Sequence, residues 1–576
     1  MEPTSRHTHL PMKKTFGKFY RIDWKHCASA VYHLQCAIAK AWQAHDLQHV
    51  HELQHKLVHK FEARALAVKR VRTQRGGKLP GVDGVVWGSD EGLMGAIDAL
   101  RTLANCQPMP LKEGAMAQTK AGRHPVRIPT MHDRAVQTLY ALALMPVAEC
   151  TADARSYAYR PYKSAHDAVA YLRLVLCSRY AKRWVLDGRI EDVFGTLSHE
   201  WLLTHIPMDC KVLEKFLKAG FLTPPNQVVY DAPMGALQGG LIAPILVNMA
   251  LYGLEHVLSD GFRVVRYGDK VVVVGKTPED LTSRALPAIR GFLAERGLRF
   301  GPRKANLIAI EDGFDFLGFT FREYANQRRA VGLKKGVFLV TPAKAKVQRF
   351  KKRLKSILKP LQHGSPARVI VRLNPVMRAW AQYYKAFNAK KVFASVRSYV
   401  WWLTWLWCRK KHPKTTPRVL RWKYFKRVEG NTWVFHARTT LNRPVTLVQL
   451  AYTPIEYHTL CKDLNPFLPA SKAYYLRRQK VGASRCASLN PSRSTLLKKQ
   501  HGVCPVCDAG LLNGEPLEVH HIHPRARGGK DTWKNLLLLH RFCHKQVTYS
   551  KNDRLKAAWR KAGIVDEGSL VPKRSP

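Results

Sequence analysis

The sequence predicts an α+β fold that is divided into several domains. The chain has 576 residues, several times the length of an ordinary domain, and 46% of them are hydrophobic. Between residues 184 and 275, strand-like runs such as FRVVRY and KVVVV alternate with helical runs such as ILVNMALYGLEHVL. Cysteines are scattered singly except toward the C-terminal end, where three are grouped with several histidines. We therefore expect a mixed body of helices and strands, followed by a small domain rich in Cys and His.

The charge of the chain indicates its class of partner. It carries 95 Lys and Arg against 41 Asp and Glu, a formal net charge of +54, which favours nucleic acid. An anionic membrane is the competing partner. However, the longest uncharged run, residues 232–254, contains two prolines and four glycines, which is typical of buried core and turn. The N-terminus has no apolar signal-peptide core, and single cysteines fit a reducing compartment. The composition argues against a small metabolic enzyme, a secreted disulfide scaffold and a membrane protein.

The remaining elements can be assigned in chain order. Residues 25–70 predict two helical segments rich in His and Ala, and residues 76–84 (GGKLPGVDG) predict a loop. Residues 331–430 then hold 26 Lys and Arg and a single acid, Glu429. A polar segment, about 426–490, separates this basic region from the Cys- and His-rich tail. The basic region is where we expect most of the contact with nucleic acid.

One strongly basic helix is predicted between Lys344 and Lys359. Apolar residues from Val347 to Leu358 recur at helical spacing, so one face packs inward while the other presents cations. A merely solvated face would normally mix both signs of charge. Trp380 and the tryptophans between 401 and 407 are expected in the local core rather than as stacking platforms. The candidate contacts with nucleic acid are Lys344, Lys346, Arg349, Lys351, Lys352, Arg353 and Arg378.

The tail contains a complete set of zinc ligands. Cys504 and Cys507 form a C-x2-C pair, and His540 and Cys543 form a second pair at the same spacing. Four ligands of these types suit a tetrahedral structural zinc. The sequence therefore predicts one structural Zn²⁺ that these four side chains bind.

Between these pairs lie Glu518-Val-His520-His521, Gly528-Gly529 and Asn535, and His544 follows them. This order resembles the HNH nuclease family, whose ββα-metal core is a hairpin and a helix that hold one catalytic cation. The resemblance implies that His521 is the general base, that His520 and His544 hold Mg²⁺ or Mn²⁺, and that Asn535 orients the loop of the base. Related tails often carry a further His where Thr548 stands. A zinc-stabilised DNA-binding tail that does not cut is the open alternative.

The body resembles group II intron-encoded proteins, the reverse transcriptase and maturase family, over roughly residues 20–550. The segments that carry the resemblance, in family order, are PGVDGVVW (80–87), RIPTMHDRAVQTLYALALMPVAE (127–149), SYAYRPYKSAHDA (156–168), WVLDGRIEDVFGTLSHEWLL (184–203), MGALQGGLIAPILVNMALYGLE (234–255), VVRYGDKVVVV (264–274), GFDFLGFTFR (313–322), LNPVMRAWAQYY (373–384) and AYTPIEYH (451–458).

The resemblance implies a right-hand polymerase-like arrangement. The implied domains are an N-terminal helical extension (1–100), degenerate fingers and palm (101–325), an α-helical thumb or maturase-specific domain (335–425), a DNA-binding segment (426–490) and the HNH domain (495–555). We expect group II intron RNA and target DNA as partners and no membrane, and a homodimer is left open.

The polymerase site of this family is degenerate here. Polymerisation requires two divalent cations held by Asp carboxylates on adjacent palm strands. Two of the three family positions hold cations, Arg189 and Lys270, and only Asp269 remains. Asp187 is displaced by about 6.6 Å along its strand, so it is a poor substitute. The triphosphate-contacting turn has also changed, with His124 where the family carries Arg. The sequence predicts that reverse transcription is absent and that Arg189 and Lys270 pair with Asp269.

Three functions follow from these resemblances. The favoured one is a maturase-like protein that binds intron RNA to assist splicing and nicks DNA with its tail. A homing endonuclease with a vestigial maturase and a splicing factor with a non-cutting tail stay open. Asn is scarce, at 14 residues, which does not suggest an AT-rich organelle genome. We expect the bacterial cytoplasm, with cyanobacteria among the candidate hosts, and a plastid or mitochondrion as the alternative.

Overall fold

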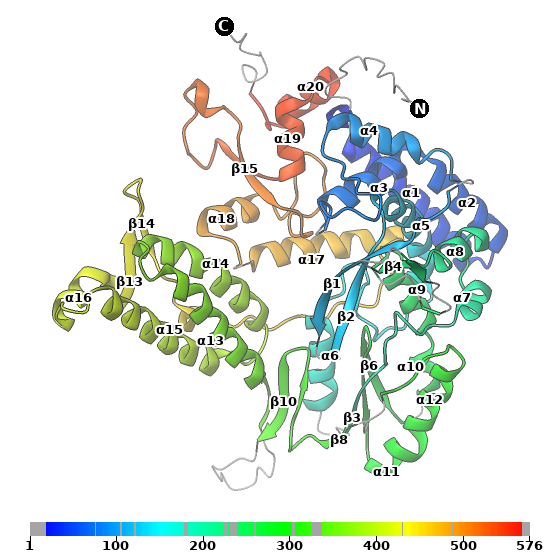
Figure 1. Cartoon of the computed structure of the whole chain (residues 1–576), viewed down its shortest axis with the longest axis horizontal. Coiled ribbons are helices and arrows are strands. Elements are labelled where there is room, and N and C mark those ends of the chain that lie inside the picture. The colour runs from blue at the N-terminus through cyan, green and yellow to red at the C-terminus, as the bar shows by residue number, and fades with distance from the viewer. Residues whose placement is uncertain are drawn as a thin grey trace, which may run out of the picture.

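The computed structural model describes residues 19–74, 76–103, 106–119, 122–177, 183–223, 228–230, 234–235, 239–258, 261–301, 306–324, 337–428, 430–486 and 488–566. Its mixture of helices and strands confirms the predicted α+β class, and Figure 1 shows separate helical and sheet regions. Within these residues, no helix combines the length and the apolar character that crossing a bilayer requires.

The N-terminal region is a helical layer. Residues 25–70 form three helices rather than the two that were predicted, because the chain breaks at His45, which has a positive φ, and again at Lys60, which is extended. Neither break contains Pro or Gly, so the sequence gives no turn signal that would predict the second break. The elements are η1 (Phe19–Arg21), α1 (Trp24–Gln43), α2 (Leu47–His59), α3 (Phe61–Thr73), α4 (Asp90–Ala99) and α5 (Met131–Cys150).

Two four-stranded sheets follow. The first has the order β2-β1-β4-β5, from β1 (Leu111–Thr119), β2 (Gly122–Ile128), β4 (Phe221–Thr223) and β5 (Val228–Tyr230). The second, the palm sheet, has the order β6-β7-β3-β8, from β3 (Trp184–Arg189), β6 (Arg263–Tyr267), β7 (Lys270–Gly275) and β8 (Asn306–Ala309). The helical elements around them are α6 (Ala165–Cys177), α7 (His199–His205), α8 (Cys210–Leu217), α9 (Ala243–Ala250), α10 (Leu254–Val257), α11 (Pro278–Asp280), η2 (Leu281–Ala285) and α12 (Leu286–Ala294).

The palm sheet separates two hydrophobic cores. Side chains alternate between the faces of a strand, so Val271 and Val273 join one core while Val272 and Val274 join the other. The first core also contains the N-terminal helices and residues of the tail, and the second contains the thumb. This double burial explains why β7 reads as a continuous valine run instead of an alternating one.

The thumb is a group of long helices that follows a three-stranded sheet. The sheet consists of β9 (Phe314–Phe316), β10 (Phe319–Tyr324) and β11 (Val337–Pro342), and the helices are α13 (Lys344–Leu358), η3 (Lys359–Leu361), α14 (Pro366–Tyr384), α15 (Lys390–Lys411) and α16 (Pro417–Tyr424). A second small sheet packs on their far end, with β12 (Phe425–Val428), β13 (Asn431–Arg438) and β14 (Pro444–Thr446) (Figure 1).

The tail has the expected ββα fold. Its hairpin pairs β15 (Leu517–His521) with β16 (Leu536–His540), and α19 (Arg541–Tyr549) follows directly. The connecting and flanking elements are η4 (Leu450–Tyr452), η5 (Pro469–Ser471), α17 (Lys472–Ser484), α18 (Pro491–Lys499), η6 (Arg525–Arg527) and α20 (Asp553–Lys561). Figure 1 places α19 and α20 beside the N-terminal helices, so the two ends of the described chain lie together.

Phe542 of α19 is the centre of this contact. Its ring packs against Phe19 and Trp24 at centroid distances of 5.4 Å each, and the Gln546 side chain donates a hydrogen bond of 2.6 Å to the Ile22 carbonyl. The buried Lys69 ammonium lies 5.3 Å from the Phe542 ring centre. Ring contacts of this kind contribute about 0.5–1.5 kcal/mol each beyond the area they bury. The tail is therefore part of the main hydrophobic core and not a separate appendage.

Candidate functional site

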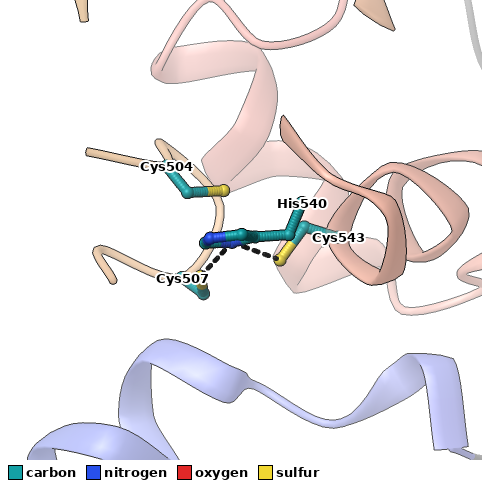
Figure 2. A group of neighbouring side chains, drawn as sticks. All are labelled: Cys504, Cys507, His540 and Cys543. Atoms are coloured by element: carbon teal, nitrogen blue, oxygen red, sulfur yellow. Dashed lines mark hydrogen bonds between the residues drawn. The ribbon is translucent and has the colours of Figure 1, made fainter. Parts of the chain in front are cut away.

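The four predicted zinc ligands converge on one point. Cys504, Cys507, His540 and Cys543 are all buried, and their ligand atoms lie within 4.8 Å of one another (Figure 2). A tetrahedral zinc with bonds of about 2.3 Å to sulfur and 2.05 Å to nitrogen requires S···N separations of about 3.5 Å. The Cys507 Sγ lies 3.5 Å and the Cys543 Sγ 3.9 Å from the His540 Nδ1. The residues present therefore fit a structural zinc site.

Neighbouring groups prepare these side chains for a metal. The His540 Nε2–H donates to the Gly510 carbonyl at 3.2 Å, which leaves the Nδ1 lone pair for the metal. Hydrogen bonds from the Cys507 and Cys543 thiols hold the pKa of Cys504 well below its usual value, so the cluster favours a thiolate. Among the described residues, this is the one group of three or more Cys, His, Asp or Glu close enough to hold an ion together.

The HNH histidines lie on the hairpin as its register requires. His520 and His521 end β15, opposite Leu537 and Leu536, so their side chains point to opposite faces. The Asn535 amide spans the connecting loop: its oxygen accepts from the His523 backbone N–H at 2.7 Å, and its nitrogen donates to the His523 carbonyl at 3.0 Å. Asn535 therefore fixes the loop that follows His521, which is the position that the family resemblance implies for it.

His520 and His544 form the candidate cation pair. Their ring centroids are 5.3 Å apart, and burial lowers the pKa of His520 to about 4, so its ring is neutral at pH 7. The His520 Nε2–H donates to the Ile564 carbonyl at 3.0 Å, and the His544 Nδ1–H donates to Glu518 at 2.9 Å. Each ring keeps one nitrogen available for a cation. Thr548 adds no third imidazole to the pair, and its hydroxyl donates to the His544 carbonyl at 2.9 Å.

His521 has a carboxylate partner that the sequence interpretation did not identify. Its Nε2 lies 2.8 Å from Asp531 and 3.1 Å from the Arg525 Nε, and Arg525 forms an ion pair with the same carboxylate. Hydrogen bonds from Arg525 and His521 hold the pKa of Asp531 well below its usual value, so Asp531 is ionised. A carboxylate in this position fixes the tautomer of an imidazole and stabilises its protonated form. The Nδ1 of His521 is then the atom that can accept a proton from water.

The degenerate palm site holds an ion pair. The Arg189 Nε lies 2.8 Å from the Asp269 carboxylate, and Arg189 and Lys270 are cross-strand partners at the end of β3 and β7. The backbone N–H of Ile190 donates to the Asp269 carbonyl at 2.8 Å, which fixes the turn beside β3. Burial raises the pKa of Asp187 to about 6. Of the two cations predicted to pair with Asp269, Arg189 is therefore the one that forms a direct ion pair among the described residues.

Arg160 and Gln238 lie in two of the segments that carry the family resemblance, and His124 lies in the changed triphosphate-contacting turn. Arg160 is buried, donates to both oxygens of Glu149 at 3.1 and 3.2 Å, and donates to the carbonyls of Asp153 and Ser156. Because these contacts occupy its guanidinium, Arg160 stabilises the fold and is not available to bind a triphosphate. Gln238 and the side chain of His124 lie outside the described part of the chain.

The thumb presents its cations as the helical spacing predicts. Val347, Phe350, Leu354 and Leu358 are the buried residues of α13, so this helix packs one face inward. The candidate RNA contacts that lie exposed on its other side are Lys344, Arg349, Lys352 and Arg353. Three candidates are half-buried: Lys346, Lys351, whose ammonium lies 5.2 Å from the Tyr399 ring centre, and Arg378 on α14.

The expectation that the tryptophans form core is correct only in part. Trp407 is buried, and Trp380 stacks on Phe350 with a centroid distance of 4.4 Å. Trp401 and Trp402 are 37% and 49% exposed, so the expectation is wrong for these two. Consecutive positions of one helix face different directions, and the composition alone could not separate them.

Four family models match the chain in order. They are the N-terminal domain of reverse transcriptase (19–100), reverse transcriptase (RNA-dependent DNA polymerase) (112–321), the group II intron, maturase-specific domain (347–427) and HNH endonuclease (504–550).

Individual relatives agree with these matches. The chain is 25% identical to Maturase-like protein 1 of Euglena gracilis over 65% of this chain and 79% of the relative. It is 28% identical to group II intron-encoded protein LtrA of Lactococcus lactis subsp. cremoris over 26% of this chain and 25% of the relative. It is 38% identical to the type IV methyl-directed restriction enzyme EcoKMcrA of Escherichia coli over 10% of this chain and 24% of the relative.

The order of domains, the zinc and HNH residues, the maturase-specific match and the relatives all indicate one family. The chain belongs to the group II intron-encoded proteins of the reverse transcriptase and maturase type, with an HNH endonuclease domain behind its maturase domain.

Proposed function

We propose that the protein binds group II intron RNA and holds it in its splicing-competent fold, while the tail nicks DNA. One observation carries the RNA part: the exposed side of α13 presents Arg349, Lys352 and Arg353 while the opposite side is buried in the thumb core. Structured RNA is recognised through its backbone and shape, which a rigid row of cations can follow. The RNA performs the splicing chemistry, and the protein contributes only binding.

Charge reversal on α13 tests this role. Arg349, Lys352 and Arg353 lie at helical spacing on the exposed face, so changing all three to Glu is expected to leave the fold intact. RNA affinity should fall, and the log–log salt slope should decrease by about 0.7–0.9 for each phosphate that the variant no longer neutralises. Filter binding at several salt concentrations and a splicing assay measure both effects.

A matched variant tests whether the loss of RNA affinity depends on where the three cations lie or only on the change in net charge. Lys56, Lys276 and Arg290 are exposed and lie outside the thumb, and reversing them changes the net charge by the same amount. We expect this variant to keep most of its RNA affinity and its splicing support. Equal losses in both variants would show that α13 is not the RNA surface.

The palm is proposed to lack polymerase activity. The Arg189 guanidinium is paired with the Asp269 carboxylate and Lys270 lies opposite Arg189, and these positive charges repel Mg²⁺. Purified protein with an RNA template, a DNA primer and Mg²⁺ or Mn²⁺ is expected to make no cDNA. Asp269→Ala should give the same result as the wild type. Primer extension that this substitution abolishes would refute the proposal.

The tail is proposed to cut by a single-cation mechanism. His521 accepts the proton of the attacking water through Nδ1, and Asp531 stabilises the imidazolium that forms. His520 and His544 would hold the Mg²⁺ or Mn²⁺ that takes up charge on the leaving oxygen. The structural zinc would be held by Cys504 and its three partners. The runner-up is a splicing factor whose tail binds DNA without cutting, and it is favoured by Thr548, which leaves the cation pair without a third His.

The finer assignments of the chain are also proposals. We place the domain limits at 1–100, 101–325, 335–425, 426–490 and 495–555, with intron RNA and target DNA as the partners. We place the protein in the bacterial cytoplasm, which the low Asn content supports. A homodimer stays a prediction.

A further inference from the structure

The thumb contains a large open cavity that the proposed α13 surface does not use. It has a volume of about 710 Å³ and lies between α15, α16 and the small sheet of β12, β13 and β14. This volume is within the range of about 300–1,000 Å³ that is typical of ligand sites. Its position, on the far end of the thumb helices, separates it from the palm and from the HNH tail (Figure 1).

Aromatic rings form one side of this cavity. Trp401 and Trp405 are one turn apart on α15, and their rings are nearly parallel, at an interplanar angle of 6° and a centroid distance of 5.9 Å. Trp433 of β13 meets Trp401 edge-on at 81°. Trp401 is 37% exposed, whereas Trp407 on the same helix is buried. The cavity therefore offers indole surface to a ligand from solvent.

Arginines supply the charge of the cavity. Arg397, Arg418 and Arg421 line it, and no Asp or Glu is among its described lining residues. The Arg421 guanidinium lies 3.7 Å from the ring centre of Trp433, so this aromatic–cation pair forms a fixed wall. A site that combines ring faces with guanidinium groups and lacks acids is complementary to a planar aromatic group that carries a negative charge.

We propose that this cavity binds an unpaired nucleotide of the RNA, with its base on the Trp401–Trp405 side and its phosphate on the arginines. Bases of single-stranded RNA loops are recognised by stacking on aromatic side chains and on arginine planes. A duplex cannot present a base face, so the site selects loops, bulges or ends. The inference rests on the proposed RNA-binding function, and it adds a site for unpaired bases to the backbone contacts of α13.

The test uses the full-length protein and two RNA probes. One is a single-stranded 12-nucleotide RNA that carries a 4-thiouridine, and the other is a fully paired RNA duplex without a loop. Trp401→Ala is expected to weaken binding of the single strand about tenfold and to leave duplex binding unchanged. Trp401→Phe keeps a ring and should recover most of the affinity. The control is Trp402→Ala, because Trp402 is 49% exposed on the same helix but does not line the cavity.

Cross-linking provides a readout that does not depend on any substitution. Irradiation of the wild type with the thiouridine RNA should label peptides within residues 397–449, and unlabelled single-stranded DNA should compete less well than RNA of the same sequence. Equal single-strand affinities of Trp401→Ala and Trp402→Ala, cross-links confined to other regions, or better competition by DNA would each overturn the inference. If the duplex is still bound in those cases, the proposed RNA-binding function stands. If the wild type binds neither RNA, both fail.

Discussion

Replacing Cys504 with Ser is expected to release the zinc and to unfold the hairpin and α19. The hairpin and α19 together have little core of their own. The four ligands come from the Cys504–Cys507 segment, β16 and α19, so the metal connects all three. Structural zinc sites of this kind have apparent binding free energies of about 10–16 kcal/mol near pH 7, more than the stability of most domains. Metal analysis and hydrogen exchange over residues 500–550 measure the two effects.

Cys486→Ser is the matched control for this change. Cys486 is also buried and precedes the same domain, but it is not one of the four ligands. We expect this variant to keep one zinc per chain and slow hydrogen exchange in the tail. One zinc per chain in Cys504→Ser, or a tail that stays protected in a strong chelator, would contradict the assignment.

His521→Ala is expected to abolish DNA nicking while zinc content and RNA affinity hold. Loss of a general base typically costs about 10²–10⁴-fold in rate. A nicking assay on supercoiled DNA with Mg²⁺ or Mn²⁺ resolves a change of this size. His501→Asn is a suitable control, because His501 lies in the same tail at a φ of 53°, a conformation that Asn tolerates. Wild-type rates in His521→Ala would remove His521 from the mechanism.

Thr548→His tests whether the cation site is incomplete. Position 548 is one turn after His544 on α19, so a histidine there projects from the same face. We expect the variant to nick faster than the wild type and to depend less on Mn²⁺. If neither the wild type nor this variant cuts DNA that contains the intron insertion site, the tail only binds DNA and the runner-up function is correct.

The sequence predicts the parts of the site that depend on local spacing. Two pairs of ligands three positions apart, a His pair at a strand end and an Asn before the next strand are short-range patterns, and the structure brings them together as expected. Asp531 and Glu518 could not be assigned in this way. Their partners, His521 and His544, lie 10 and 26 residues away, so their roles depend on how the loop and the helix return to the hairpin.

The fold was predictable to a similar extent. The palm strands follow from their hydrophobic runs, whereas the break at Lys60 contains no Pro or Gly and gives no turn signal. The small sheet that begins at Phe425 lies in the segment that was interpreted as polar, although Gly430 and Asn442 mark its turns. Trp401 and Trp407 lie in the same aromatic stretch of sequence. Only the packing of α15 decides that Trp401 is exposed and Trp407 is buried. The cavity in the thumb is therefore a property of the tertiary structure.

The contact between the two ends of the chain has a consequence for synthesis. The Gln546 side chain bonds to the carbonyls of Tyr20 and Ile22, more than 520 residues earlier in the chain. A ribosome that adds about 5–20 residues per second needs roughly 25–100 s to make the intervening segment. During that time Phe19 and Trp24 lack Phe542, the ring that covers them in the finished protein. The nascent N-terminal helices thus expose an aromatic surface until Phe542 has been synthesised, and this interval is when aggregation or chaperone binding is expected.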